Sequence, residues 1–247
     1  MRFALSSLLL LFCFHANSKE QIAVRVAADI WCPYTCEAGE RPGYLIEVMQ
    51  KALSFQKIRV DYEVVNWARA VKEAGEGSYY AIAGASKDDA PNFVFPERAQ
   101  MELFFELFTL KDKNWKFAGY EKGKKIGVIN GYNYDEKSNE EIRKKNPDFV
   151  VVSGERGLNS LIPMLNMGRV DAILETKGVF FEGLRNLKID SKMYKSIGTT
   201  SAPIPHFIAF SPKYADAKKI AALLVDGQKK LEKSGELKKI KQKYGLN

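Results

Sequence analysis

A repeated order of strand, helix and strand constrains this fold more than any other feature. An apolar run at 22–28 is followed by a turn-rich loop, and apolar residues at helical spacing then favour a helix over 45–53. Residues 58–64 alternate as a strand does, Asn66 can cap a second helix, and 79–84 is a further strand. Such alternation is typical of α/β folds in which helices cover both faces of parallel sheets.

A second set of the same elements follows a lysine-rich junction at 111–125, after an extended run at 103–110. We expect strands at 125–130, 148–152 and 170–174, and helices from Asp135, over 158–165 and over 178–185. The chain then crosses back to a strand at 206–210 and two helices broken near Gly235. We predict two Rossmann-like α/β lobes, with 19–110 and 206–247 in lobe 1 and 111–205 in lobe 2. Crossings near 105–112 and 200–206 would form a two-strand hinge.

The N-terminus has the pattern of a signal peptide. Arg2 precedes an uncharged apolar run at 3–14, and Ala16 and Ser18 are the small residues that a signal peptidase reads before a cut after Ser18. The run is shorter than the roughly 20 residues that span a bilayer. Phe12 before Cys13 argues against a lipid anchor. We therefore expect residues 1–18 to be removed and the mature protein to be periplasmic.

The formal charge of +8 comes with lysines that crowd the C-terminal end of the chain. They recur at helical spacing among apolar residues such as Leu224, Leu231 and Leu237. This pattern is typical of the solvated face of an amphipathic helix. We therefore expect no nucleic-acid partner.

Removal of the signal peptide leaves two cysteines, Cys32 and Cys36, in an oxidising compartment, where a disulfide is expected. Four extended steps span roughly 13 Å and a bridge needs about 4.4–6.8 Å, so residues 33–35 must fold back. A ring this small adds only about 2 kcal/mol, so it would shape a site more than hold the fold. A zinc site would lack ligands, because His206 is the only histidine after the signal. No metal and no cofactor are expected.

Ligands of open α/β sheets bind at strand ends and the loops after them. The first-lobe candidates for ligand contact are Trp31, Tyr34, Trp67, Gly84 and Ser86. Trp31 and Tyr34 lie in the cysteine loop with few apolar companions, which favours a cleft over core packing. Arg69 could fork onto a carboxylate, and an ordinary surface salt bridge is the alternative.

The second-lobe candidates lie in a turn before a helix and at the end of a strand. Gly131 opens a turn at 131–134 that precedes a helix, and the backbone N–H groups of this helix could bind an anionic or carbonyl group. Tyr132 and Tyr134 would then wall the pocket; a plain turn with exposed tyrosines is the alternative. Glu175 and Thr176 stand at the outgoing end of the strand at 170–174.

An ordered series of short segments resembles the periplasmic solute-binding proteins of family 3, the type that serves polar amino acids. The segments are ADIW at 28–31 with PY at 33–34, PGY at 42–44, WAR at 67–69, AIAGAS at 81–86, FP at 95–96, KKIGV at 124–128, GRVDA at 168–172 and KQKYG at 241–245. The resemblance implies a type II periplasmic binding fold that clamps a small polar solute between its lobes. It also implies a monomer that delivers the solute to the membrane permease of an ABC importer.

The chain departs from this family at two places. Members that bind α-amino acids place an arginine after the strand matching 79–84, where this chain reads SKDD from Ser86 to Asp89. They place an aspartate just beyond 170–174, where Thr176 stands beside Glu175. The expected carboxylate clamp is missing. If Asp89 and Glu175 both face the cleft beside Trp31 and Trp67, charge pairing and cation–π contact would allow a cationic solute.

Two other functions fit the same fold. A dehydratase-like periplasmic enzyme would need Glu175 or Asp89 as general acid or base, with a pKa raised towards neutrality by burial. The sequence has no metal cluster, nucleotide loop or nucleophile triad, so no catalytic residue is expected. A sensory module that presents its closed state to a membrane receptor is the third possibility.

Overall fold

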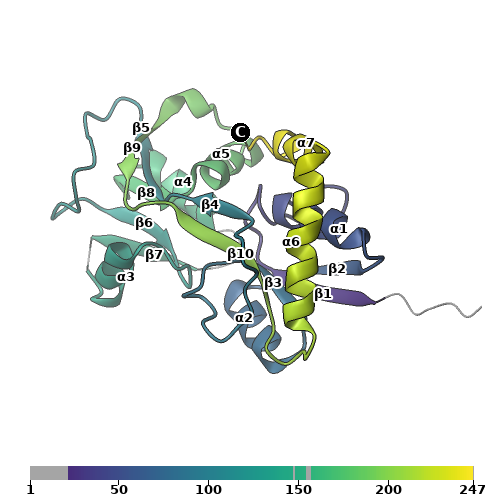
Figure 1. Ribbon diagram of the computed structural model, residues 1–247. Helices are drawn as coiled ribbons and strands as arrows, with labels where there is room; N and C mark the ends of the chain where they lie inside the picture. Colours follow the sequence, from purple (N-terminus) through teal and green to yellow (C-terminus); the bar gives the residue numbers. More distant parts are fainter. Residues whose placement is uncertain (1–21, 147, 154–156, 247) are drawn as a thin grey trace, which may run out of the picture.

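The computed structural model describes residues 22–146, 148–153 and 157–246, and the expected signal peptide at 1–18 lies outside them. Two lobes, each built on a five-stranded sheet with helices packed against it, lie next to each other (Figure 1). Within the described ranges, no helix is long and apolar enough to cross a bilayer. The two expected α/β lobes are confirmed.

The first sheet has the order β2-β1-β3-β10-β4. Its strands are β1 (Ala23–Ala28), β2 (Arg59–Val64), β3 (Ala81–Ala85), β4 (Met101–Leu103) and β10 (Ile204–Phe210). The helices of this lobe are α1 (Tyr44–Ser54), α2 (Trp67–Glu76), α6 (Ala217–Lys233) and α7 (Glu236–Lys243). Helices α1 and α6 pack closely at Gly227, where a Cβ would stand 2.3 Å from the carbonyl oxygen of Ala52.

The second sheet has the order β7-β6-β8-β5-β9. Its strands are β5 (Glu106–Leu110), β6 (Ile126–Ile129), β7 (Phe149–Val152), β8 (Ala172–Glu175) and β9 (Tyr194–Thr199). The helices are α3 (Glu136–Arg143), α4 (Gly157–Asn166), α5 (Lys177–Asn186) and a short 3-10 helix, η1 (Ser191–Met193). Phe108 of β5 stacks on Phe180 of α5, with ring centroids 4.2 Å apart, so strand and helix share one core.

Three predictions about the sheets need correction. The sheets are mixed, because β10 pairs antiparallel with β3 and β4, and β5 pairs antiparallel with β8 and β9. The run at 103–110 is not one extended segment, since β4 belongs to the first sheet and β5 to the second. The lobe boundary therefore falls at Phe104–Phe105 rather than after residue 110. Strand β9 was not predicted.

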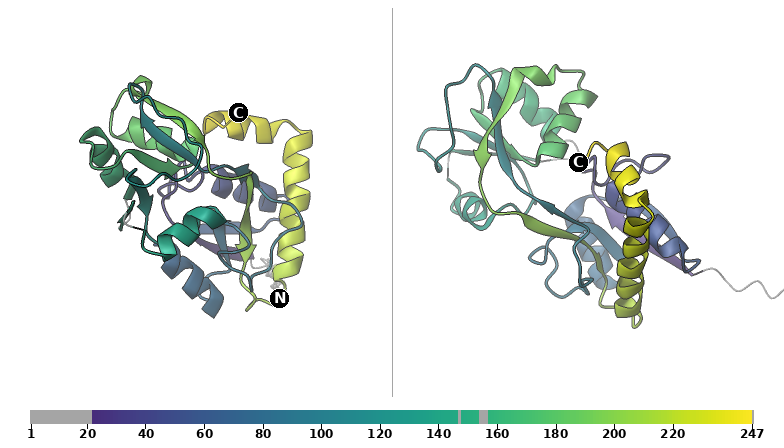
Figure 2. Two further views of the ribbon diagram at one scale, coloured as in Figure 1. Left: turned by 90° about the vertical axis from the view of Figure 1, so that its left-hand side faces the viewer. Right: turned by 45° about the horizontal axis from the view of Figure 1, so that its top comes forward.

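The chain passes between the lobes twice, from β4 to β5 and from β9 to β10 (Figure 2). The first crossing consists of Phe104 and Phe105, and the second of residues 200–203. They are joined by the backbone N–H of Thr200, which donates to the Phe105 carbonyl at 2.9 Å. The Thr200 hydroxyl donates to Asp135 Oδ2 at 2.6 Å, which ties the return crossing to the start of α3. Two adjacent crossings of this kind are the geometry of a hinge.

Candidate ligand-binding site

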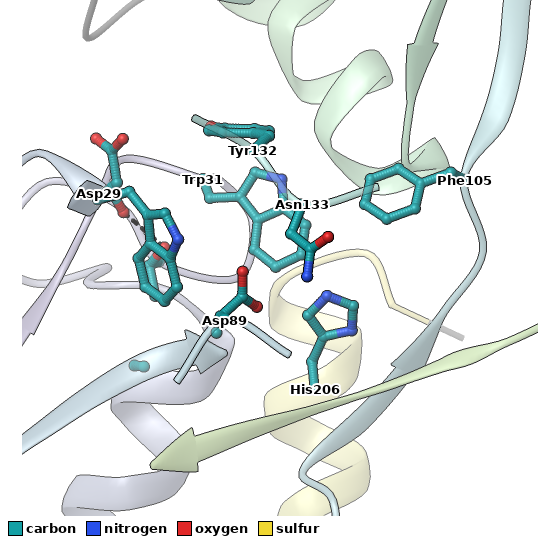
Figure 3. A pocket seen from close by; sticks show the side chains of 11 residues that line it. Asp29, Trp31, Asp89, Phe105, Tyr132, Asn133 and His206 are labelled. Atoms are coloured by element: carbon teal, nitrogen blue, oxygen red, sulfur yellow. Dashed lines mark hydrogen bonds between the residues drawn. The ribbon is translucent and has the colours of Figure 1, made fainter. Parts of the chain in front are cut away.

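A small cavity of ≈ 50 Å³ lies between the lobes (Figure 3). Lobe 1 and the crossings contribute Asp29, Trp31, Thr35, Trp67, Ala83, Gly84, Asp89, Phe105 and His206, and lobe 2 contributes Tyr132 and Asn133. Because one water needs about 10–15 Å³ of such space, the cavity holds a few waters or a small solute.

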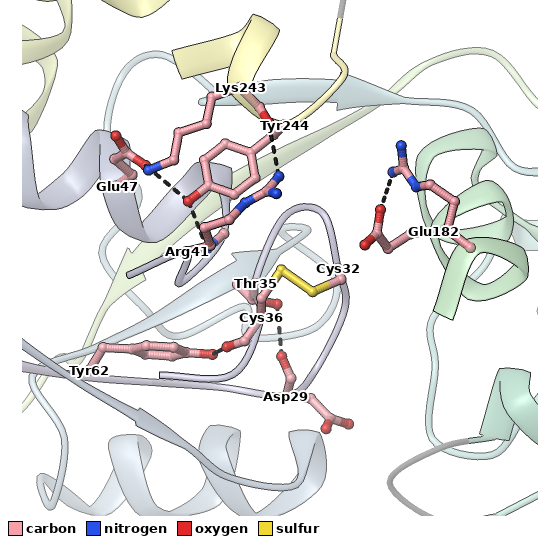
Figure 4. The surroundings of a disulfide bond; sticks show 12 residues. Asp29, Cys32, Thr35, Cys36, Arg41, Glu47, Tyr62, Glu182, Lys243 and Tyr244 are labelled. Carbon is pink, nitrogen blue, oxygen red and sulfur yellow. Dashed lines mark hydrogen bonds and ion pairs between the residues drawn. A yellow bond between two sulfur atoms is a disulfide. The ribbon is translucent and has the colours of Figure 1, made fainter. Parts of the chain in front are cut away.

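The cysteine loop positions Trp31 at the cavity wall. Cys32 and Cys36 form the expected disulfide, with an S–S distance of 2.00 Å and Cα atoms 4.8 Å apart. The loop folds back on itself, since Trp31 N donates to the Thr35 carbonyl at 2.7 Å. The Thr35 hydroxyl donates to the Asp29 carbonyl at 2.7 Å, and Tyr62 donates to the Cys36 carbonyl at 2.8 Å (Figure 4). The expected disulfide is confirmed, and it lies in the loop that carries Trp31 and Thr35 to the cavity wall.

Glu175 stands behind Trp31 rather than in the cavity wall. Its Oε1 accepts hydrogen bonds from Trp31 Nε1 at 3.4 Å and from Thr176 N at 2.7 Å. Its side chain is fully buried, and Oε2 has no hydrogen-bond partner among the described residues. Burial raises the pKa of Glu175 from its ordinary value of 4.5 to about 7, against these hydrogen bonds. The contact from Trp31 to Glu175 joins the two lobes and fixes the plane of the indole.

Asp89 is held at the cavity by a tight turn. Its Oδ2 accepts from Ser86 N at 2.6 Å and from the Ser86 hydroxyl at 2.7 Å. Burial raises the pKa of this carboxyl, and the hydrogen bonds from Ser86 oppose the rise. Asn133 of lobe 2 donates to the Ser86 hydroxyl at 3.3 Å, a second contact across the lobes. Gly84 leaves space beside Trp31, which a side chain would fill, because a Cβ there would stand in van der Waals contact with the indole at 3.5 Å.

His206 enters the cavity from β10, just after the return crossing. The centroid of its ring lies 5.3 Å from that of the Trp31 ring, and its Nδ1 is 2.8 Å from the Ile204 carbonyl oxygen. A carbonyl only accepts, so this contact places the proton on Nδ1 and leaves Nε2 as the acceptor of a neutral ring. Burial lowers the pKa of His206, which keeps the ring neutral at pH 7. Figure 3 shows His206, Asn133 and Asp89 directed into the same space.

Three predicted ligand contacts lie away from the cavity. Arg69 is exposed, and its Nε is 2.7 Å from Glu73 Oε1, so it forms the surface salt bridge that was the alternative. Gly131 is exposed in the turn before α3. Tyr134 is buried, and its hydroxyl accepts from Ile129 N at 2.8 Å. The N-terminus of α3 is capped by Asp135, which accepts from Ser138 N at 3.1 Å.

The remaining predicted residues fall into two groups. Those that line the cavity are Trp31, Trp67, Gly84, Asp89 and Tyr132. Those that support its wall from behind are Tyr34, Ser86, Glu175 and Thr176. The lining residues that sequence reasoning missed are Asp29, Thr35, Ala83, Phe105, Asn133 and His206. Asn133 lies in the predicted turn at 131–134. Phe105 lies in the first crossing and His206 just after the second, so closeness to a crossing is the sequence signal that could have identified these two residues.

No protein-family model and no curated protein matches the chain. Solved structures match it over most of its length. A Streptococcus pneumoniae substrate-binding protein of an ABC uptake transporter, with bound histidine, has a TM-score of 0.73 at 16% identity, covering 90% of this chain and 92% of that one. A histidine kinase sensor domain similar to periplasmic binding proteins has a TM-score of 0.72 at 17% identity, covering 90% and 95%.

A third similar structure is the ancestral amino acid-binding protein AncCDT-1, a precursor of cyclohexadienyl dehydratase. Its TM-score is 0.68 at 15% identity, and the match covers 90% of this chain and 95% of that one. At such identities the likeness concerns the fold. The chain has the type II periplasmic binding fold, so the resemblance drawn from the sequence segments is confirmed at that level.

Proposed function

We propose that the protein is a periplasmic solute-binding protein, exported by cleavage after Ser18, that hands a small polar solute to the permease of an ABC importer. The observation that carries this proposal is the cavity itself, whose wall is built by both lobes and by Phe105 of the first crossing. The similar substrate-binding protein from Streptococcus pneumoniae, which holds histidine, supports the same role. Binding needs no covalent chemistry, and the protein acts as a monomer.

Capture follows from closure about the two crossings. The contacts from Trp31 to Glu175 and from Asn133 to Ser86 join the lobes in the closed arrangement. A solute that touches both lobes binds the closed arrangement more tightly than the open one, and therefore shifts the population towards it. The importer can then recognise the closed form.

Thermal unfolding of the mature protein tests this proposal. The panel contains amino acids, amines, organic acids and small sugars. A ligand at 100 times its Kd stabilises by about 2.7 kcal/mol, which raises Tm by several degrees in a chain of this size. The matched control is Trp31→Ala, which removes a cavity wall and should abolish the shift. A panel without any stabilising solute contradicts the proposal.

A second candidate function is proton-transfer catalysis, and the raised pKa of Glu175 is the observation that favours it. A pKa of about 7 suits a general acid or base at neutral pH. In the closed arrangement, however, Glu175 does not line the cavity and bonds to the indole N–H of Trp31. Turnover of a bound solute, followed by NMR and lost in Glu175→Gln, would support catalysis over simple binding.

A further inference from the structure

We propose that the solute is a small organic cation without a carboxylate group, held by Asp89, the Nε2 atom of His206 and the faces of aromatic rings. This inference rests on the proposed solute-binding function and names the class of solute. It differs from the α-amino acids that the sequence resemblance implies. Four properties of the cavity carry it.

The first property is the sign of the charges at the wall. The Asp89 carboxylate is directed into the cavity, and no lysine or arginine within the described ranges lines it. Arg69, the cation expected to clamp a carboxylate, is exposed and paired with Glu73. A carboxylate ligand would therefore lose its hydration beside the like charge of Asp89, with no cationic side chain at the wall to pair with it, which is strongly unfavourable.

The second property is the state of Asp89. Ser86 donates two hydrogen bonds to its Oδ2, and the Asn133 side chain also donates to the carboxylate, but no ion pair in the described part of the chain neutralises it. Its burial makes the charge costly, as the raised pKa shows. A cation in the cavity would offset that cost through a charge-assisted hydrogen bond.

The third property is the presence of hydrogen-bond acceptors that face the cavity. The Nδ1 proton of His206 is directed to the Ile204 carbonyl, so the ring offers the cavity an acceptor. The indole N–H of Trp31 is used by Glu175, and the Asn133 amide donates to Ser86. A ligand that donates N–H groups fits the two acceptors at the wall, Nε2 of His206 and the Asp89 carboxylate.

The fourth property is the aromatic lining. With its N–H bonded elsewhere, Trp31 presents its ring to the cavity, and three further rings line it, those of Trp67, Phe105 and Tyr132. A cation that lies over such a ring face is attracted by the negative charge of the π system, and more strongly when it has lost its water. The volume of ≈ 50 Å³ favours a compact head group such as an ammonium or methylated ammonium ion.

Two pairs of probes test the inference by isothermal titration calorimetry on the mature protein. Ethanolamine and glycine share an ammonium group, and choline and glycine betaine share a trimethylammonium group; in each pair only the second carries a carboxylate. We expect ethanolamine or choline to bind, with a preference of about 30-fold or more over its partner. Equal or tighter binding of glycine or glycine betaine overturns the inference, as does binding of only uncharged or anionic solutes in the wider panel. If no solute of any class binds, the proposed function itself fails.

Two variants locate the effect. Asp89→Asn keeps an oxygen that can accept from Ser86 and removes the charge, and we expect it to weaken the bound probe by about 30-fold or more. Asp88→Asn removes the same charge from the exposed neighbour and should change affinity by less than about twofold. Unfolding curves without ligand establish that both variants fold. Equal losses in the two variants would show general electrostatics and overturn the assignment of Asp89.

Discussion

Replacing Glu175 by glutamine should make the protein more stable at high pH and leave it nearly unchanged at low pH. The carboxyl is fully buried, and its pKa is about 7 in the folded protein against an ordinary value of 4.5. Below pH 4.5 it is protonated in both the folded and the unfolded chain, so it carries no penalty. As the pH rises from 4.5 to about 7 the unfolded chain loses its proton first, and the free energy of unfolding falls.

The size of the effect follows from the two pKa values. A difference of about 2.5 between them corresponds to about 3 kcal/mol, at about 1.4 kcal/mol per pKa unit. Glutamine stays neutral, and its oxygen can accept from Trp31 and Thr176 as Oε1 of Glu175 does. Because opening of the lobes would also relieve the ionised carboxylate, about 3 kcal/mol is an upper limit for the gain above pH 7.

The assay is thermal or urea unfolding of both proteins from pH 4 to pH 8. We expect the difference between variant and wild type to grow by up to about 3 kcal/mol in favour of Glu175→Gln, or about 6–12 °C in Tm. Other titratable groups near Glu175 are present in both proteins, so their contributions to the free energy of unfolding cancel in this difference. Glu106 lies opposite Glu175 in the sheet. Tyr34, Tyr132 and Tyr134 have pKa values raised by burial and stay neutral. Parallel pH profiles of the two proteins would refute the reasoning.

Three further predictions concern closure and the cysteine loop. Gly178→Ala should hold the lobes apart, because a Cβ there would stand 2.8 Å from the Tyr34 hydroxyl of the other lobe. Small-angle scattering should then show a larger radius of gyration than for the wild type, and an unchanged radius would contradict this. Trp31→Phe should destabilise the closed form by about 1–3 kcal/mol, since Glu175 loses its indole donor. Wild-type ligand affinity in the variant would show that the contact from Trp31 to Glu175 does not hold the lobes closed. The double variant Cys32→Ala with Cys36→Ala should lower the free energy of unfolding by only about 2 kcal/mol, measured by urea unfolding. It should weaken ligand binding more than tenfold, measured by calorimetry, and unaltered affinity would disprove a role for the bridge in shaping the site.

Local periodicity predicted most elements of the fold. The amphipathic helices α1 and α6 and the alternating strand β2 are visible in the spacing of apolar residues. The prediction of one extended segment at 103–110 was wrong, because the apolar pattern of a segment does not indicate which sheet it joins. Strand β9 was missed since its sequence, YKSIGT, is largely polar and it forms by pairing with β5, which is distant in the chain.

The site was predictable in part for the same reason. Strand ends pointed to Trp31, Gly84 and Asp89, which do line the cavity. The same rule singled out Glu175, but only the packing of the lobes shows that it bonds to the indole N–H of Trp31 instead of facing the cavity. His206 is the only histidine after the expected signal peptide, and its place in the cavity depends on where the return crossing enters the first sheet.

The central claim is that the closed lobes hold one small solute, and its most direct test lets the protein choose that solute. The mature protein is incubated with a small-molecule extract of bacterial culture, freed of unbound material by gel filtration and denatured, and the released molecules are identified by mass spectrometry. The account predicts one class of small amine, enriched towards one molecule per protein and lost in Asp89→Asn. Enrichment of a carboxylate solute would contradict the cationic assignment, and no enrichment over Asp89→Asn would contradict capture between the lobes.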